Sequence, residues 1–480
     1  MQLSTKIAYN TIIQTSSKII ATLLGLLAIA IITRYLGQTG FGQYTTVITF
    51  LSFFATIADL GLTLVTVQMI SQPQADQNKI LGNLLALRLF SAVIILGIAP
   101  LAVWFLPYAN LIKWGVLITC SAFLFNALNQ ILVGLFQKNL RLDKVAIAEV
   151  ASRIFLVIGF GVVVKFNYGL AGILIATVLA NALSFGLHYF FSLSFARIRL
   201  QYDFNYWRAI LKKSWPLALT IILNLIYLRT DTLLLSIIPR PSSIGIIAEV
   251  GLYGAAYKVI DVLITLPFMF AGLILPLLTA SWAGKNFVDF KSLMQRSFDM
   301  MIILSAPIVI GTQLVANKIM VAIAGPDFVA AGRILQLLIV AGGAIFFGIV
   351  FAHAVIAIDQ QKKIISAYLF TAITSVIGYL IFIPLFSYYG AAGVTIYSEI
   401  AIAYASFYLV RKYARFSPNW SVPLKALAAA ATMGIITWLL ISHWQLPLVF
   451  ILIIAALIYF LALFLFRGLK KEDLLILINK

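Results

Sequence analysis

The stretch YLRTDTLLL, from Tyr227 to Leu235, places Arg229 and Asp231 two positions apart in an otherwise apolar run. An ionised side chain at the centre of a bilayer costs at least about 2.5 kcal/mol, so such residues face a bundle interior or a water-filled cavity. These two cannot pair with each other, because residues two apart on a helix point away from each other. Their partners, whether protein groups or a charged ligand, are therefore expected elsewhere in the chain.

Other charged residues also interrupt apolar runs, and these side chains could bind a charged substrate. The cations are Lys18, Arg88, Arg153, Arg229, Lys258 and Arg333, and the acids are Asp59, Glu149, Asp231, Asp261 and Glu399. At 1.5 Å per residue, Arg229 and Asp261 lie roughly 14 and 15 Å from the predicted outer ends of their helices. Asp231 and Lys258 match likewise, one step nearer the outer surface. One interpretation is a neutral network, Arg229–Asp261 and Asp231–Lys258, that holds two helices together. The other is that these groups line a cavity and exchange protein partners for an anionic substrate.

In the first half of the chain, cations outnumber the acids that could neutralise them. Glu149 and Arg153 form an i, i+4 pair with the acid first, which is the favoured order, so we interpret that pair as structural. Only Asp59 then remains for Lys18 and Arg88. Because an unpaired cation in a cavity attracts phosphate, Lys18 is the first choice for a substrate contact.

Motifs for covalent chemistry are missing from this sequence. It has no GxxxxGK[ST] phosphate-binding loop, so it carries no P-loop ATP motor. Cys120 is the single cysteine, and the three histidines fall on separate apolar runs without ligand spacing. We therefore expect no internal disulfide, no metal site and no cofactor. No predicted outer loop is large enough for a catalytic domain, so the sequence predicts no catalytic residues and favours transport over an enzyme activity.

The composition indicates the class of protein. The chain has 480 residues, of which 62% are hydrophobic and 10% charged, whereas a soluble domain carries about a quarter charged residues. Apolar runs of about 20 residues match the roughly 30 Å hydrocarbon layer. We predict an all-α polytopic membrane protein with about fourteen transmembrane helices, near 9–33, 43–69, 81–106, 112–136, 145–166, 168–195, 216–238, 251–281, 299–324, 329–357, 364–387, 391–410, 424–442 and 447–466.

Lysine and arginine are distributed unevenly between the two sets of predicted loops. One side holds only five of them, namely Arg34, Lys113, Lys165, Arg240 and Lys318. Because cytoplasmic loops are enriched in basic residues, we expect a multi-pass protein of the cell membrane with both termini in the cytoplasm. The same rule explains the formal net charge of +19, and no nucleic acid is expected as a partner.

Two stretches of the chain repeat one another. YGLAGI at Tyr168–Ile173 matches YGAAGV at Tyr389–Val394, and GQY at Gly42–Tyr44 matches GLY at Gly251–Tyr253. Short matches in the same order and at similar spacing indicate an internal repeat. Six spans per copy give both copies the same orientation, an architecture that alternating-access transporters use.

The repeat predicts four parts of the chain. An N-terminal six-helix lobe covers 1–196, and an interfacial linker helix covers 197–215. A C-terminal six-helix lobe covers 216–412, and two extra transmembrane helices with a cytoplasmic tail cover 413–480. The linker alternates basic, aromatic and apolar residues, which is typical of a helix in the headgroup layer; a plain linker is the alternative.

Two regions resemble a known family. TRYLGQTGFGQY at Thr33–Tyr44 with DLGL at Asp59–Leu62, and RTDTL at Arg229–Leu233 with LYGAAYK at Leu252–Lys258, are similar to bacterial polysaccharide flippases of the Wzx type. That family serves O-antigen and exopolysaccharide assembly, and its superfamily includes multidrug and toxic-compound exporters and lipid II flippases. The resemblance implies two six-helix lobes around a central cavity. It also implies movement of a polyprenyl-(pyro)phosphate-linked oligosaccharide from the cytoplasmic to the outer leaflet by alternating access.

The resemblance also implies roles for the charged residues. Cations of the cavity would meet the pyrophosphate, and the candidates are Lys18, Arg88, Arg229 and Lys258. The acids of the charge network, which could also couple transport to a gradient of Na⁺ or H⁺, are Asp59, Asp231 and Asp261. Expected partners are the lipid-linked oligosaccharide and the bilayer, with a polysaccharide polymerase or other assembly proteins as further candidates.

Two other functions remain as alternatives. A cation-coupled exporter of small organic molecules from the same superfamily would need an excess of carboxylates in its cavity, whereas this sequence offers slightly more intramembrane cations than acids. A polysaccharide polymerase or ligase would be expected to have a sizeable polar outer loop, and the sequence predicts none.

Overall fold

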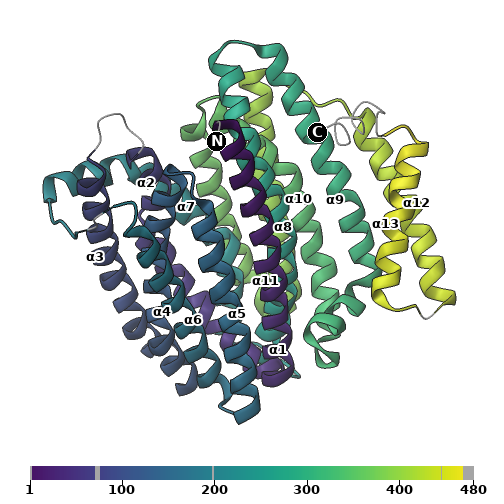
Figure 1. The fold of residues 1–480 in the computed structure, drawn as a ribbon. Helices are drawn as coiled ribbons and strands as arrows, with labels where there is room; N and C mark the ends of the chain where they lie inside the picture. Colours follow the sequence, from purple (N-terminus) through teal and green to yellow (C-terminus); the bar gives the residue numbers. More distant parts are fainter. Residues whose placement is uncertain (1–2, 71–75, 197–198, 445, 469–480) are drawn as a thin grey trace. The chain divides into compact units, whose positions relative to one another are not determined.

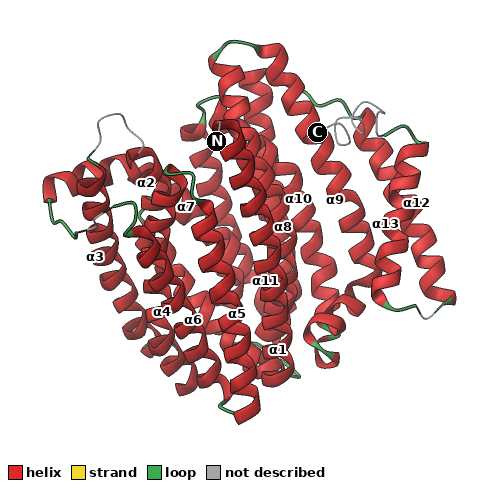
Figure 2. Cartoon of the chain, viewed as in Figure 1, coloured by secondary structure: helices red, strands yellow, loops and turns green. Residues whose placement is uncertain are grey.

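The computed structural model describes residues 3–70, 76–196, 199–444 and 446–468, and these ranges contain helices and no strand (Figure 2). Figure 1 shows the helices in chain order. Their bounds are α1 Leu3–Asp59, α2 Leu62–Ile70, α3 Gln77–Trp104, α4 Asn110–Lys138, α5 Leu142–Phe166, α6 Gly169–Ser192, α7 Phe204–Ile237, α8 Ile246–Ala283, α9 Phe287–Ala324, the short 3₁₀ helix η1 Pro326–Phe328, α10 Ala331–Ala357, α11 Gln361–Ala414, α12 Ser421–His443 and α13 Leu448–Leu465.

Twelve of the described helices are long and apolar enough to cross a membrane. Two of them are too long for one crossing: α1 has 57 residues and α11 has 54, or roughly 80 Å each at 1.5 Å per residue. Each breaks at one residue with positive φ, Gly37 at 64° and Ser387 at 51°. Each therefore contains two membrane-crossing segments. The prediction of an all-α polytopic membrane protein with about fourteen spans is confirmed.

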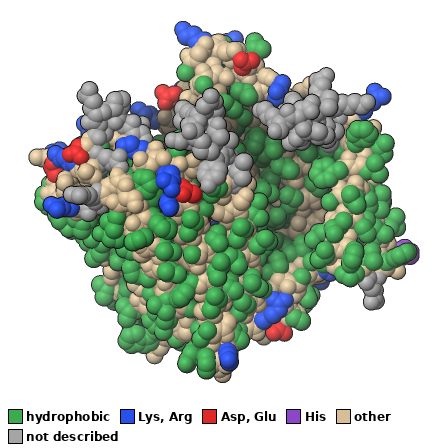
Figure 3. Space-filling model, in the orientation of Figure 1, with side chains coloured by type: hydrophobic (Ala, Val, Ile, Leu, Met, Phe, Trp, Pro, Cys, Tyr) green, Lys and Arg blue, Asp and Glu red, His purple; other side chains and the backbone are tan. Residues whose placement is uncertain are grey.

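The outer surface of the helices is apolar. Large hydrophobic side chains such as Leu23, Leu101, Phe190 and Leu457 are more than half exposed. Figure 3 shows hydrophobic side chains over the flanks of the helices, with Lys and Arg mostly near the helix ends. A large exposed apolar surface of this kind marks contact with a membrane.

The first compact unit covers Met1–Gly251. Its helices α3, α4 and α6 pack side by side (Figure 1), and α1 packs on α3, α4, α5 and α7. The boundary differs from the predicted one, which placed residues from 216 onward in the second lobe. α7 belongs to the first unit because it packs against α1, α2 and α3. Within 199–215, residues 204–215 form the first turns of α7 rather than a separate linker helix, and 197–198 lie outside the described residues.

The second compact unit covers Leu252–Lys480 and contains most of α8 and the helices α9–α13. Its main core is aromatic: Phe298 of α9 contacts Phe347 and Phe351 of α10, with ring centroids 5.5 and 5.9 Å apart. The two helices that the sequence places outside the repeat, α12 and α13, pack on each other and on α9. Tyr459 of α13 anchors this contact by donating a hydrogen bond of 2.7 Å to the carbonyl of Ile303.

Two glycines at matching positions of the repeat meet in the first unit. A Cβ on Gly42 of α1 would overlap the carbonyl oxygen of Ile247 in the first turns of α8. A Cβ on Gly251 would overlap the carbonyl oxygen of Gln38. The second segment of α1 and the start of α8 therefore cross backbone to backbone, and glycine on both sides permits this approach.

Candidate functional site

Arg88 of α3 forms a buried ion pair with Asp59, the last residue of α1. Its Nη1 lies 2.7 Å from Asp59 Oδ1, and its side chain is 4% exposed. The guanidinium also donates to the carbonyl oxygens of Ala127 and Ala58, at 3.1 and 3.2 Å. Asp59 accepts a further hydrogen bond from the hydroxyl of Thr63. Arg88 is thus hydrogen-bonded to the protein on several sides, and its predicted contact with a substrate stays a prediction.

The end of α1 explains why a cation is buried here. Leu60 and Gly61 both have positive φ, 50° and 71°, and stop the helix. The last carbonyls of a helix have no intrahelical donor and carry the negative end of its dipole. Arg88 supplies one donor to Ala58, and the hydroxyl of Ser91 supplies another at 2.9 Å.

Lys18 has a different environment. It lies exposed on the first segment of α1, beside the exposed apolar side chains of Ile19 and Leu23. Within the part of the chain that the structure describes, its ammonium group has no hydrogen-bond or ion-pair partner. At 1.5 Å per residue it lies roughly 28 Å along the helix from the break at Gly37. Lys18 is therefore an exposed cation near the middle of the first segment of α1, available to an anionic ligand.

Four charged residues, Arg229, Asp231, Lys258 and Asp261, lie around the start of the second half of the chain. Lys258 lies 3.6 Å from Asp261, one turn along α8, with the two side chains 35% and 24% exposed. Asp231 is fully buried on α7 and accepts hydrogen bonds from the backbone N–H and the hydroxyl of Thr232. Arg229 is half-buried on α7. The structure thus brings Lys258 together with Asp261, and the pairs Arg229–Asp261 and Asp231–Lys258 stay predictions.

Sequence reasoning missed one buried ion pair and predicted another that does not form. Arg240, assigned to an outer loop, has a side chain only 1% exposed and donates to Glu249 at 2.6 and 2.8 Å. It also donates to the carbonyl of Leu235, which ties the end of α7 to the start of α8. Glu249, an acid in the first turn of α8, could have indicated in the sequence that Arg240 has a partner. Conversely, Glu149 and Arg153 are not within ion-pair distance of each other among the described residues.

The end of α7 is also held by a buried tyrosine. Tyr108, between α3 and α4, lies 2.6 Å from the hydroxyl of Ser236, which itself donates to the carbonyl of Leu233. Burial raises the pKa of Tyr108 to about 12, and the hydrogen bond with Ser236 acts in the opposite direction.

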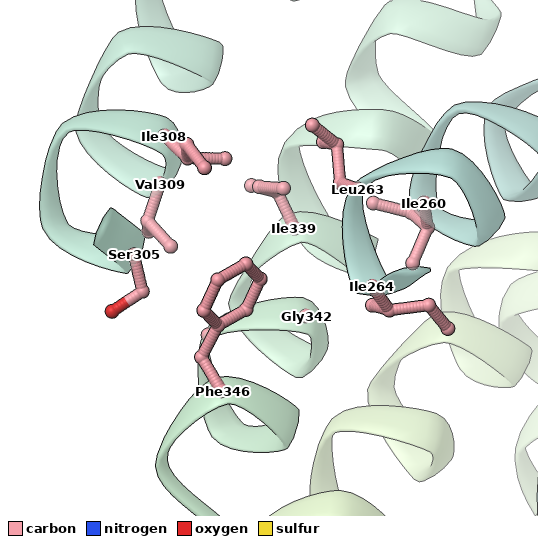
Figure 4. Close-up of a pocket in the computed structure, with 10 residues that line it drawn as sticks. Ile260, Leu263, Ile264, Ser305, Ile308, Val309, Ile339, Gly342 and Phe346 are labelled. Atoms are coloured by element: carbon pink, nitrogen blue, oxygen red, sulfur yellow. The ribbon is translucent and has the colours of Figure 1, made fainter. Parts of the chain in front are cut away.

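A small crevice in the second unit is apolar. Ile264 of α8, Val309 of α9 and Phe346 of α10 lie around it (Figure 4), and the space between the lining side chains is too narrow to hold a water molecule. Ser305 is the one polar side chain among its lining residues. Such a lining suits hydrocarbon and offers nothing to a phosphate.

Comparisons with known proteins concern both sequence and fold. A family model described as "Polysaccharide biosynthesis protein" matches residues 7–282. None of the curated protein sequences compared matches the chain. Among solved structures, the lipid II flippase MurJ in an inward closed conformation superposes with a TM-score of 0.76 at 16% identity, over 98% of this chain and 100% of that one.

Two further structures share the fold. One is an inward-facing multidrug resistance MATE family transporter of the MOP superfamily, with a TM-score of 0.67 at 14% identity over 84% of this chain and 97% of that one. The other is a MOP superfamily transporter from Pyrococcus furiosus, with a TM-score of 0.57 at 13% identity over 83% of this chain and 95% of that one. At these identities the likeness shows the fold.

Proposed function

Because this chain belongs to the polysaccharide biosynthesis protein family, we propose that it is a flippase for a polyprenyl-(pyro)phosphate-linked oligosaccharide. It moves this lipid from the cytoplasmic to the outer leaflet of the cell membrane by alternating access, for the synthesis of a cell-surface polysaccharide. The observation that carries the proposal is the family match over 7–282 together with a fold that, across 98% of the chain, resembles a lipid II flippase. Both proteins would handle a large anionic headgroup on a long hydrocarbon chain.

The exposed cations support an anionic headgroup. Lys18 has no protein partner among the described residues, so a phosphate could bind it without displacing an acid. Lys258 is a third exposed and paired with Asp261 at 3.6 Å, a distance and exposure at which an ion pair is weak and exchangeable. We therefore assign Lys18 as the first phosphate contact and Lys258 as a second, with Arg229 as a third candidate. Arg88 is removed from this set because it is hydrogen-bonded within the protein.

The test uses purified protein in lipid vesicles that contain a polyprenyl-pyrophosphate disaccharide with a nitrobenzoxadiazole label. A membrane-impermeant reductant quenches the label in the outer leaflet of the vesicle only. Vesicles with the protein are expected to lose most of the fluorescence, while empty vesicles lose about half because one leaflet is protected. Equal loss in both kinds of vesicle, with and without a Na⁺ or H⁺ gradient, would refute the flippase.

The alternative of drug export can be tested in the same vesicles with ethidium as a small organic cation. The flippase proposal predicts no protein-dependent accumulation of ethidium, because the carboxylates of Asp59 and Asp261 already pair with cations of the protein. Accumulation of ethidium without movement of the labelled lipid would favour the exporter.

A further inference from the structure

Glu399 is a buried carboxyl group to which the flippase proposal gives no role. It lies on the second segment of α11, residues 388–414, and is 7% exposed. Its Oε1 has no hydrogen-bond partner among the described residues. The residue lies roughly 18 Å along the helix from the break at Ser387, near the middle of a hydrocarbon layer about 30 Å thick. An ionised carboxylate in such a place is costly unless it is paired, so the group carries a proton in this conformation.

The helix α10, which packs on α11, brings no cation to this carboxyl. A Cβ on Gly348 of α10 would come within 2.8 Å of the Ala403 side chain, which fixes the level at which the two helices meet. His353 of α10 lies about 13 Å further along from the level of Glu399 by helical rise, with its Nδ1 2.9 Å from the carbonyl of Ile349. Arg333, the other charged residue of α10, is exposed near the start of that helix.

The other neighbouring segments bring a tyrosine and an ion pair. Tyr368, on the first segment of α11, is half-buried and lies close enough to Glu399 to interact with it electrostatically. On α8, which reaches α11 through Tyr253, Lys258 pairs with Asp261 at 3.6 Å. Glu399 therefore lies near a neutral hydroxyl, and none of the described cations forms an ion pair with it.

Hydroxyl groups lie before and after Glu399 on the same face of its helix. Thr395 lies one turn before it, and Ser406 lies two turns after it, so the three share one helix face. The hydroxyl of Thr395 lies 3.2 Å from the hydroxyl of Tyr379 and 3.4 Å from that of Tyr253. Ser406 is fully buried, and its Oγ has no partner among the described residues. Along the helix axis, the carboxyl of Glu399 thus lies roughly 6 Å from the level of Thr395 and roughly 10 Å from the level of Ser406.

The first segment of α11 also carries hydroxyl groups close to the second segment. Thr374 and Tyr397 join the two segments of α11 through their hydroxyls at 3.0 Å. Beside them, the buried Oγ of Ser375 has no hydrogen-bond partner among the described residues. Three buried oxygens without partners, on Ser375, Glu399 and Ser406, therefore lie between these two segments or along one of their faces. A buried polar group without a partner costs about 1–3 kcal/mol, so their presence together needs a reason other than stability.

We propose that Glu399 is a proton-binding site that couples lipid movement to the proton gradient across the membrane. The idea rests on the proposed flippase function. In one conformation the carboxylate forms an O–H bond with a proton from water on the outer side, by way of Thr395 and the tyrosine hydroxyls. In the other conformation that bond breaks, and the proton passes towards Ser406 and cytoplasmic water. Protons thus move inward as the lipid moves outward. A metal cation is disfavoured because it needs several oxygen ligands, and the described residues contain no cluster of acids or histidines that could hold one.

The first experiment needs no lipid substrate. Infrared difference spectra of the detergent-solubilised protein are recorded across a pH step. We expect a carbonyl band of a protonated, buried carboxylic acid in the wild type and its loss in Glu399→Gln. The half-buried Glu149→Gln serves as the matched control and is expected to keep the band. A band that persists unchanged in Glu399→Gln, or its absence from the wild type, would overturn the proton site.

The second experiment measures coupling in vesicles that contain pyranine as an internal pH indicator and the labelled polyprenyl-pyrophosphate disaccharide. A proton gradient is expected to accelerate lipid movement by the wild type, with proton entry that Glu399→Gln abolishes. Ser406→Ala is expected to slow proton entry and to keep the infrared band. Equal acceleration in the wild type and Glu399→Gln would overturn the coupling while leaving the flippase intact. Absence of lipid movement by the wild type would refute the flippase and its coupling, and the infrared result would still stand for the proton site.

Discussion

Removal of the Arg88 side chain would leave Asp59 buried and ionised, without its counter-ion. Arg88→Met keeps an apolar side chain of similar length but loses the contact of 2.7 Å with the carboxylate. The remaining donor to Asp59, the Thr63 hydroxyl, is neutral. Breaking a buried pair by removing one partner costs about 3–5 kcal/mol, because a charge remains without compensation. We expect Arg88→Met to lose stability by that amount.

The second half of this prediction concerns the double variant. In Arg88→Met with Asp59→Asn, no buried charge remains, and replacement of both members of a buried pair is often close to neutral. The two carbonyls that Arg88 leaves do lose a donor, but Ala58 keeps its hydrogen bond from Ser91 at 2.9 Å. We therefore expect the double variant to lose only about 1–2 kcal/mol, less than the single variant.

Unfolding by increasing dodecyl sulfate in mixed micelles measures these differences, and the labelled-lipid assay measures transport by whatever folded protein remains. Lys362→Met, at an exposed cation, is the control and should change neither. Wild-type stability in Arg88→Met, combined with loss of lipid movement, would refute the reasoning and return Arg88 to the substrate site. A double variant less stable than the single one would also contradict it.

Three other changes have definite expected results. Gly42→Ala should destabilise the protein by about 1–3 kcal/mol in the same unfolding assay, because the added methyl group overlaps the Ile247 carbonyl. Gly25→Ala is the control and should not destabilise the protein, because the space around Gly25 is open. Equal stability of the two variants would contradict the close crossing. Lys18→Ala should reduce lipid movement at least tenfold with wild-type unfolding, and unchanged movement would exclude the phosphate contact. Burial holds the pKa of Tyr108 at about 12 in the folded protein, above its ordinary value of 10.0, so its contribution to stability is complete below pH 10 and is lost as the pH rises through 12. Tyr108→Phe should lose about 1 kcal/mol of stability near neutral pH and should be destabilised less at alkaline pH. An unchanged dependence of stability on pH above pH 10 in this variant would contradict the prediction.

The membrane-spanning segments could be predicted because the bilayer sets their length. The predicted spans ending at 33 and 387 lie close to the breaks at Gly37 and Ser387, since the apolar runs stop there. The grouping of the helices was less predictable. Nothing in the sequence of α7 indicates that it packs against α1, α2 and α3, because an apolar helix suits either lobe.

The charged residues show the same division between local and non-local information. Lys258 and Asp261 are three apart on one helix, so their pairing required only helical periodicity. The count of acids left Asp59 for both Lys18 and Arg88 and did not indicate which of the two cations it pairs with. The two carbonyls that also bind Arg88 could not be inferred, because they depend on where α1 ends. Arg240 was misassigned, since the positive-inside rule treats a loop cation as solvated whereas this one is buried.

The repeat in the sequence and the crossing of α1 with α8 have one physical cause. Gly42 and Gly251 occupy equal positions in the two copies, and each would collide with the backbone of the other's segment if it had a Cβ. A close approach between two helices needs small residues on both of them, because one larger side chain is enough to separate the backbones. One of the two glycines without the other would therefore not permit the close approach of the helices. The glycines in the short match between Gly42–Tyr44 and Gly251–Tyr253 thus lie where the second segment of α1 crosses the start of α8.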